Sequence, residues 1–227
     1  MKHVVVLTGA GISAESGIKT FRDADGLWEG HDVMEVASPQ GFAKNPELIL
    51  NFYNERRKQL LTVKSNDAHK ALATLESEYK VTIVTQNVDD LHERAGSTNI
   101  IHLHGELLKV RSNFNEHDIW SCKSDIVLGD LCENGYQIRP HIVWFGEAVP
   151  MMEEAIQICK TADILVIIGT SMQVYPAASL MNFVPKQTPI YYIDPKPANV
   201  NSERVTVINK TATQGMKQLL ILLKQKD

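Results

Sequence analysis

Apolar residues recur along the chain in short continuous runs that are bounded by turn-forming residues. Five of these runs predict strands, at His3–Leu7, Val81–Thr85, Asn99–Leu103, Ile164–Gly169 and Ile190–Ile193. Continuous runs rich in β-branched residues are typical of parallel strands that are covered on both faces. We therefore expect one buried parallel sheet.

Stretches with helical periodicity alternate with these strands. They span Pro46–Leu61, Asp67–Glu78, Met151–Lys160 and Thr213–Lys224. Asp67 is a candidate N-cap, and Pro46 suits the first turn of its helix. The alternation of strand and helix predicts an α/β fold with a doubly wound parallel sheet of the Rossmann-like kind.

Two stretches interrupt this alternation. Residues 23–65 predict helices without an intervening strand, and residues 106–140 are polar with only short patterns. We expect a single domain, 1–227, in which these stretches form a smaller inserted module. The large part would cover about 1–22, 67–105 and 141–227, and the module about 23–66 and 106–140, with Ile119, Trp120, Ile126 and Leu128 as its candidate core.

Composition narrows the classes of protein to consider. With 44% hydrophobic and 22% charged residues, the chain is typical of soluble globular proteins. A net charge of −4 gives no basic footprint for nucleic acid, and no apolar stretch approaches the ~20 residues that span a bilayer. The three cysteines lack paired spacing, and a strand begins too early to leave room for a leader. We expect a cytoplasmic protein, and a monomer.

The first predicted strand leads into a glycine-rich turn, Gly9–Ser13, which is followed by Ser16 and Gly17. Glycines let a backbone turn tightly and approach a pyrophosphate, and the helix start that follows points N–H groups at it. The run does not complete the six-residue dinucleotide pattern. Taken alone, it predicts a phosphate site and a tight turn without ligand about equally well.

Two later segments carry groups suited to catalysis. Thr85–Asp89 supplies amide and carboxylate side chains directly after a strand, and Ile101–Gly105 supplies His104. An imidazole titrates near neutrality and suits proton transfer. In isolation, His104 would more often be a core histidine bonded to backbone, and His102 a structural strand residue. Together with the glycine turn, the segments indicate chemistry on a bound dinucleotide.

Taken together, these segments resemble the sirtuin family of NAD-dependent protein lysine deacylases. The matching segments are Gly9–Ser13 with Ser16–Ile18 and Phe21-Arg22, Thr85–Asp89, His102–Gly105, Val143–Glu147, and Gly169–Ser171 with Tyr175–Ala177. They occur in the family's order and span nearly the whole chain. The likeness extends to the class III bacterial members that remove succinyl and malonyl groups.

The resemblance implies NAD as cofactor and acylated lysine side chains of proteins or peptides as partners. The acyl group would pass from lysine to ADP-ribose, with release of nicotinamide and formation of O-acyl-ADP-ribose. His104 would be the general base and Asn87 a second catalytic residue, while Val143, Trp144 and Phe145 would pair with the peptide as an added strand. Residues implied to bind NAD are Gly9, Ala10, Gly11, Ser13, Ser16, Thr20, Phe21, Arg22, Gln86, Asn87, Asp89, Gly169, Thr170, Ser171, Asp194 and Ala212.

A tyrosine and an arginine bear on the identity of the acyl group. Tyr53 and Arg56 are three residues apart, on one face of a predicted helix. A phenol and a guanidinium can bind a carboxylate jointly, and the same resemblance implies this pair in the succinyl- and malonyl-removing class, with Ala37 widening the pocket. The alternative is a Tyr53 that packs inward and an Arg56 in solvent. We expect recognition of acidic acyl groups, with acetyl-lysine as a further substrate.

The sequence departs from the family where sirtuins usually bind structural zinc through four cysteines. Residues 106–140 hold only Cys122 and Cys132, and Ser112 stands where a first ligand is expected. We therefore expect a zinc-ribbon-like excursion without zinc and no other metal. A second departure is Asp194, where the family commonly has asparagine. A carboxylate at a strand end can still accept from ribose hydroxyls.

Two other functions stay open from the sequence. An activated ribose can be trapped by another nucleophile, which would make the protein an ADP-ribosyltransferase. The chain could also be a non-catalytic NAD-binding sensor, although His104, Asn87 and Asp89 argue against it. A hydride-transfer dehydrogenase fits less well, because the third glycine and the downstream acidic residue of that pattern are absent.

Overall fold

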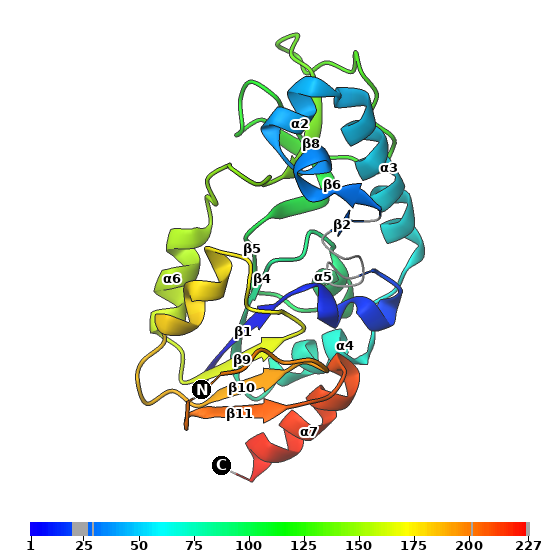
Figure 1. Ribbon diagram of the computed structural model, residues 1–227. Coiled ribbons are helices and arrows are strands. Elements are labelled where there is room, and N and C mark those ends of the chain that lie inside the picture. Colours follow the sequence, from blue (N-terminus) through cyan, green and yellow to red (C-terminus); the bar gives the residue numbers. More distant parts are fainter. Residues whose placement is uncertain (20–26, 29, 201, 226–227) are drawn as a thin grey trace.

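The computed structural model describes residues 1–19, 27–28, 30–200 and 202–225. Its centre is a six-stranded sheet of order β11-β10-β9-β1-β4-β5, in which every pair of neighbours is parallel (Figure 1). This arrangement confirms the predicted doubly wound, Rossmann-like sheet. The strands are β1 (His3–Thr8), β4 (Lys80–Thr85), β5 (Ile100–His102), β9 (Ile164–Ile168), β10 (Ile190–Ile193) and β11 (Val205–Ile208).

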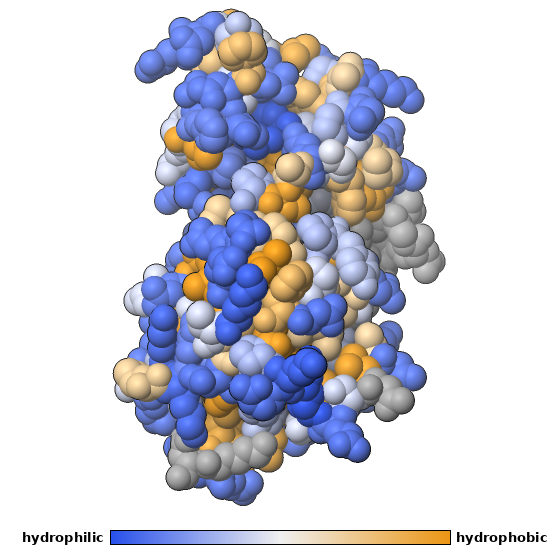
Figure 2. Space-filling view, turned by 90° about the vertical axis from the view of Figure 1, so that its left-hand side faces the viewer, coloured by the Kyte–Doolittle hydropathy of each residue, from blue (hydrophilic) through white to orange (hydrophobic). Residues whose placement is uncertain are grey.

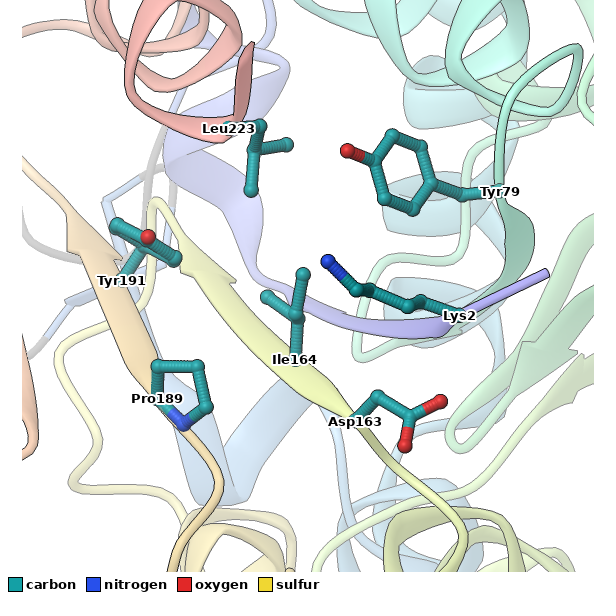
Figure 3. Close-up of a pocket in the computed structure, with 7 residues that line it drawn as sticks. All are labelled: Lys2, Tyr79, Asp163, Ile164, Pro189, Tyr191 and Leu223. Atoms are coloured by element: carbon teal, nitrogen blue, oxygen red, sulfur yellow. The ribbon is translucent and has the colours of Figure 1, made fainter. Parts of the chain in front are cut away.

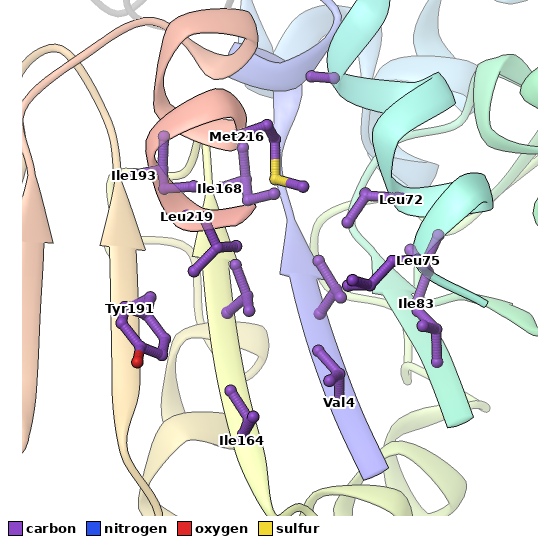
Figure 4. Packing of buried hydrophobic residues seen from close by; sticks show 14 of the residues in the cluster. Val4, Leu72, Leu75, Ile83, Ile164, Ile168, Tyr191, Ile193, Met216 and Leu219 are labelled. Carbon is purple, nitrogen blue, oxygen red and sulfur yellow. The ribbon is translucent and has the colours of Figure 1, made fainter. Parts of the chain in front are cut away.

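Successive residues of β1 face opposite sides of the sheet, as the pleat of a strand requires. Val4 and Val6 pack into one apolar cluster, and Val5 and Leu7 pack into another. Helices α4 (Asp67–Leu75) and α7 (Ala212–Lys224) cover the first face (Figure 4). The second face is covered by α6 (Met152–Lys160) and the short helix η3 (Ala177–Asn182). Because both faces are covered, the central strands β1 and β9 are buried along their whole length.

A smaller module with its own apolar cluster lies beyond one edge of this sheet, at the top of Figure 1. It contains a three-stranded antiparallel sheet of order β7-β6-β8 packed against helices. The space-filling view shows the molecule narrowing between the two lobes, with apolar surface exposed there (Figure 2). The elements of the module are β2 (Leu27–Trp28), β3 (His31–Asp32), α1 (Val33–Val36), α2 (Pro39–Lys44), α3 (Pro46–Thr62), β6 (Gly105–Ser112), β7 (Ile119–Ser121) and β8 (Ile138–Ile142).

Three local predictions are wrong. The N-cap of α4 is Asn66 rather than Asp67, because its side-chain oxygen accepts from the Ala68 N–H. The stretch 23–65 is not purely helical, since β2 and β3 pair as a hairpin. The sheet also has a sixth strand, β11, whose alternating Val-Thr-Val-Ile pattern lacks the continuous apolar run that marked the others.

The predicted core of the module is largely wrong as well. Ile126 is 1% exposed, but Ile119, Trp120 and Leu128 are 41%, 40% and 52% exposed. Ile119 and Trp120 belong to β7, an edge strand that pairs with β6 on one side only. The buried cluster is instead supplied mainly by α3, β6 and β8. Within the described residues, no helix is both long and apolar enough to cross a membrane.

The side chain of Asn54 joins α3 to the rest of the module. Its Oδ1 accepts from the Ile126 N–H at 2.9 Å and from Arg57 Nη1 at 2.8 Å, and its Nδ2 donates to the Ile126 carbonyl at 2.8 Å. Arg57 Nε in turn donates to the Leu107 carbonyl at 3.2 Å. Asn54 and Arg57 are both buried, so these bonds take the place of bonds to water, although Arg57 Nη2 has no partner among the described residues.

We expect Asn54→Ala to destabilise the protein by about 2–4 kcal/mol, because it strands several buried backbone and guanidinium groups without partners. Asn51→Ala is the matched control, since Asn51 is exposed on the same helix. Urea denaturation measures both variants. Equal midpoints for the two would show that the Asn54 bonds contribute nothing net.

Candidate functional site

The turn after β1 lies directly against the loop that follows β9. The N–H groups of Gly9 and Gly11 donate to the carbonyls of Ile168 and Gly169, at 3.0 and 2.8 Å. A Cβ on Gly11 would lie 2.5 Å from the Gly169 Cα, so no side chain fits there. The glycines are therefore required by this close approach of two backbones, whether or not a phosphate binds. Among the described residues the N–H of Ala10 has no acceptor, which leaves it available to a phosphate oxygen.

The hydroxyl of Ser13 is the centre of a buried polar network. Its Oγ donates to Asp89 Oδ2 at 2.9 Å and accepts from Asn87 Nδ2 at 3.2 Å. All three side chains are buried. Residues from two separate predicted NAD-binding segments are therefore held in one hydrogen-bonded group at the carboxyl ends of β1 and β4.

His69 supports this network from α4. Its Nδ1 accepts from the Asn66 N–H at 3.3 Å, which places its proton on Nε2, and Nε2 lies 3.5 Å from Ser13 Oγ. Asn66 Nδ2 donates to the Ile12 carbonyl and to Ser16 Oγ, at 2.8 and 3.0 Å. Burial lowers the pKa of His69 to about 4, so it is neutral at pH 7. Sequence reasoning missed both residues, although an asparagine three residues before a histidine at a helix start is a capping-box pattern.

A second buried histidine, His92, stands behind the first. Its Nε2 lies 3.1 Å from Thr8 Oγ1, and that hydroxyl donates to Thr85 Oγ1 at 2.8 Å. The His92 and His69 rings are 4.9 Å apart at their centroids. Burial holds the pKa of His92 well below its usual value. No pattern in the sequence distinguished His92 from the other histidines.

The carboxyl group of Asp89 is the ionisable member of the network. Burial raises its pKa to about 6, although hydrogen bonds from the Leu91 N–H and from Ser13 oppose the rise. The group therefore titrates just below neutrality. An ionised Asp89 at pH 7 is held by those two donors, and it can accept a further hydrogen bond from a ligand.

His104 stands at the point where the chain leaves β5 and enters the module. Its Nδ1 lies 3.0 Å from the Gln86 carbonyl, and a carbonyl can only accept, so Nδ1 carries the proton and Nε2 is free to act as a base. Burial lowers the pKa of His104, and the bond to Gln86 partly offsets this. His102 instead contacts the Asn87 carbonyl at 3.1 Å and Glu93 Oε1 at 2.7 Å, as suits a structural residue.

The remaining residues predicted to bind NAD lie along the same edge of the sheet. Gln86 Nε2 donates to Thr170 Oγ1 at 3.2 Å, which joins the loops after β4 and β9 across β1. Ser171 follows Thr170 and is partly exposed. Asp194, after β10, is buried, and its Oδ1 accepts from the Lys196 N–H at 2.7 Å.

Helix α7 reaches the glycine turn at its first residues. Ala212 is buried there, and the backbone and hydroxyl of Thr213 donate to the Glu15 carboxylate at 2.9 and 2.8 Å. The predicted residues Thr20, Phe21 and Arg22 lie outside the described residues.

The three residues predicted to select the acyl group contact the apolar cluster of the module. Ala37 and Tyr53 are both buried in it, and Tyr53 is fully covered. Arg56 lies with its guanidinium carbon 4.6 Å from the Phe52 ring centroid. Its Nε is buried without a hydrogen-bond partner, and no anionic side chain among the described residues pairs with it. Arg56 also borders an open hollow of about 430 Å³ on the surface of α3.

The segment Val143–Phe145 has its N–H groups already occupied. Val143 donates to the His104 carbonyl and Phe145 to the Ala37 carbonyl, each at 2.9 Å, while Trp144 donates to Glu147 Oε2 at 2.8 Å. Pairing with a peptide along this segment would therefore have to use its carbonyl groups. The same bonds place the segment between the base His104 and Ala37.

The excursion 106–140 does not offer a set of zinc ligands. Cys132 Sγ lies 3.6 Å from Ser112 Oγ, a hydroxyl rather than a thiolate, and Cys122 Sγ bonds to the Ser124 carbonyl at 3.4 Å. In the described parts of the chain, no three His, Cys, Asp or Glu side chains gather as a metal site would require. The absence of zinc stays a prediction.

Another hollow, of about 270 Å³, opens at the opposite, amino end of the sheet (Figure 3). Lys2, Tyr79, Asp163 and Tyr191 are among its lining residues. None of the predicted site residues borders it. It is therefore separate from the group of loops at the carboxyl edge.

Comparison with known proteins gives a consistent result. The pattern of the Sir2 family matches residues 9–176. An NAD-dependent protein deacylase of Helicobacter pylori is 61% identical over 221 residues, covering 97% of this chain and 96% of its own. One from Bacteroides thetaiotaomicron is 54% identical over 230 residues, covering 98% of each chain.

Solved structures agree with these relatives. A Sir2 homolog in complex with NAD superimposes with a TM-score of 0.88 at 39% identity, covering 99% of this chain and 90% of its own. A Sir2 structure bound to an acetylated peptide superimposes with a TM-score of 0.80 at 28% identity, covering 97% of this chain and 93% of its own.

The pKa of Asp89 predicts a pH-dependent stability. In the unfolded chain this carboxyl would titrate near ~3.9, and in the folded protein at about 6. Between these values the folded state holds a proton that the unfolded state has released, so raising the pH from 4 to 7 should lower the free energy of unfolding. The loss attributable to Asp89 should be on the order of 2–3 kcal/mol.

Asp89→Asn isolates this contribution, because the other groups, including His69 and His92, titrate in both proteins. The stability of the variant relative to the wild type should increase as the pH rises from 4 to 7, measured by denaturant unfolding at each pH. A difference that stays constant with pH would contradict the raised pKa.

Proposed function

Because the chain belongs to the Sir2 family and is an NAD-dependent protein deacylase, we propose that it prefers lysine acyl groups that end in a carboxylate, such as succinyl and malonyl. Acetyl-lysine is a second, weaker substrate. The observation that carries the proposal is a pair of donors, the Tyr53 O–H and Arg56 Nε, for which the described residues supply no acceptor.

Arg56 supports the proposal because it is a cation that pairs with no anion among the described residues. Its Nε is buried, and a buried donor without a partner costs roughly 1–3 kcal/mol. The guanidinium rests on the Phe52 ring, which fixes its plane. A carboxylate would restore the missing hydrogen bonds with two parallel N–H contacts.

Tyr53 and Ala37 support it by chemistry and size. Burial raises the pKa of Tyr53, so the phenol keeps its proton and can donate it. Ala37 is a small residue in the same apolar cluster, which leaves more room than a larger side chain would. Arg56, Tyr53 and Ala37 therefore suit an extended acyl group that ends in a carboxylate better than an acetyl group, which ends in a methyl.

The reacting end of the site uses the groups around Ser13 and His104. We assign to Ser13, Asn87 and Asp89 the binding of the nicotinamide and its ribose, and to the Ala10 amide a phosphate oxygen. When bound, NAD would supply the ribose carbon that the acyl oxygen attacks as nicotinamide leaves, and the hydroxyl that then takes up the acyl group from lysine. His104 Nε2 accepts the proton of that hydroxyl, because Nδ1 is committed to Gln86.

The neutral histidines behind the site fit a reaction that passes through positive charge. His69 and His92 are both uncharged at pH 7 because burial lowers the pKa of each. They can therefore orient hydroxyl groups without repelling a developing cation on the ribose. The network supplies fixed dipoles and one carboxylate, Asp89, of favourable sign.

We place the reaction in the cytoplasm, where thiols stay reduced. The three cysteines are free, and burial raises the pKa of Cys159 to about 12, which keeps it an inert thiol. Acylated lysines on other proteins are the partners that we propose, bound through the backbone beside Val143–Phe145. We propose that the protein acts as a monomer.

The preference for acidic acyl groups depends on Arg56. We expect Arg56→Met to lower the ratio of kcat/KM for a succinyl-lysine peptide to that for the matched acetyl-lysine peptide by about tenfold to a hundredfold, since a charge-assisted pair is worth roughly 1.5–3 kcal/mol. Mass spectrometry of NAD-dependent deacylation measures both peptides. Lys44→Met, which removes an exposed cation of α2, is the control. An unchanged ratio in Arg56→Met would rule out the proposed preference.

The base His104 sets the acid limb of the pH profile. Its neutral form is the active one, and burial lowers its pKa from the usual 6.5, so the midpoint of the acid limb of kcat should lie below pH 6.5. His104→Ala should lower kcat by about 10²- to 10⁴-fold, while His117→Ala, an exposed histidine, serves as control. An acid limb centred above pH 7 would exclude His104 as the group observed.

A further inference from the structure

We propose that Trp144 is a positioning residue for acyl-group selection: its indole N–H occupies the oxygen of Tyr53 and so directs the Tyr53 O–H toward the acyl carboxylate. The inference rests on the proposed preference for acidic acyl groups. It adds Trp144, which does not bind the carboxylate itself but sets the direction of the Tyr53 O–H that does.

The hydrogen bond between the two rings carries the argument. Trp144 Nε1 lies 3.0 Å from Tyr53 Oη, and both side chains are buried. An indole N–H can only donate, so the phenol oxygen must accept. The phenol proton is then not used in this bond, and it points elsewhere.

No other described residue takes that proton. The bond from Trp144 is the one hydrogen bond of the Tyr53 hydroxyl within the described parts of the chain. Tyr53 is fully buried, so water does not substitute, and an acyl carboxylate can reach its hydroxyl only when neighbouring side chains of the module move apart. A buried O–H without an acceptor is unfavourable, and a ligand oxygen on that side would relieve it. Arg56, one helical turn along α3, is the neighbouring group that lacks a partner.

Trp144 is itself held at several points. The Arg139 guanidinium lies 3.3 Å from the centroid of its ring, and the ring also contacts Phe42 at a centroid distance of 5.3 Å. Its backbone N–H donates to Glu147 at 2.8 Å. The indole therefore has little freedom to rotate, and the direction of its N–H is fixed.

Glu147 joins these supports into one unit. Its carboxylate accepts from Arg139 Nη1 and Nη2 at 2.7 and 3.1 Å, and from Arg111 Nη2 at 3.1 Å. Arg139 Nη2 also donates to the Ile142 carbonyl at 2.9 Å. A chain of contacts thus runs from Glu147 through Arg139 and Trp144 to the phenol of Tyr53.

The consequence is a division of labour within the pocket. Arg56 supplies a positive charge, which attracts any carboxylate in the pocket. Tyr53 supplies an O–H of fixed direction, which binds a carboxylate well in one position only. With phenylalanine at 144 the phenol oxygen would lose its donor, and the O–H would be free to turn about its C–O bond. Recognition of the carboxylate would weaken while the apolar wall stayed in place.

The test compares Trp144→Phe, Tyr53→Phe and the double variant, with Trp120→Phe as the matched control on the exposed edge strand β7. For each, kcat and KM are measured with matched succinyl- and acetyl-lysine peptides at saturating NAD. We expect Trp144→Phe to raise KM for the succinyl peptide about tenfold relative to the acetyl peptide, with the effect in KM rather than kcat. The double variant should lose no more selectivity than Tyr53→Phe alone, because the two residues act through one hydrogen bond.

Each alternative outcome overturns a distinct statement. If the losses of the two single variants multiply in the double variant, Trp144 does not act through Tyr53. Equal losses with both peptides would mean that Trp144 is only structural. If Arg56→Met is selective but Trp144→Phe matches the wild type, the positioning role fails while the acidic preference stands. A wild type without any preference for the succinyl peptide overturns both.

A measurement on the indole itself covers the case in which Trp144→Phe does not fold. The chain has three tryptophans, so its indole N–H signals in a ¹H–¹⁵N spectrum are few and can be assigned by substitution. Tyr53→Phe should move the Trp144 indole proton upfield, because its acceptor is gone, and Arg56→Met should not. If Tyr53→Phe leaves the chemical shift of the Trp144 indole proton unchanged, the proposal is overturned.

Discussion

Everything at the carboxyl edge of the sheet depends on the close approach of two backbones, at Gly11 and Gly169. No side chain fits between them, and their amide and carbonyl groups are joined at 2.8 Å. The contact lies between β1 and β9, where the chain switches from building one half of the sheet to building the other. Loops diverge at such a point, and the space between them is where doubly wound sheets bind ligands.

Behind that edge, the protein buries a group of polar side chains that are joined by hydrogen bonds. Ser13 acts both as donor and as acceptor, and the histidines that support it stay neutral because burial disfavours their charge. The helix-capping residue also bears on the network: Asn66 fixes the tautomer of His69, so that the nitrogen facing Ser13 carries a proton. The cap residue of α4 is thereby linked, through His69, to the network around Ser13.

The sheet could be predicted from sequence because its strands are buried on both faces and so consist of unbroken apolar runs, as in β9. β11, with threonine at its second position, carried no such signal. In the site, Ser13, Asn87, Asp89 and His104 were found through family motifs, and the structure gathers them at one edge. The contacts of His92, Glu147 and Arg139 could not be predicted, because partners distant in the chain, such as Thr8 for His92, define them. Ile119 and Trp120 were wrongly predicted as core because they lie on the edge strand β7, where their side chains are exposed.

The position of His104 has a mechanical consequence. It occupies the crossing between the lobes: its carbonyl accepts from Val143, which directly follows β8, and its ring bonds to Gln86, which directly follows β4 of the large sheet. A rotation of the module about this crossing would move its outer tip through a wide arc while displacing the imidazole very little. If the lobes moved in this way, access to the chemistry would change while the base kept its alignment.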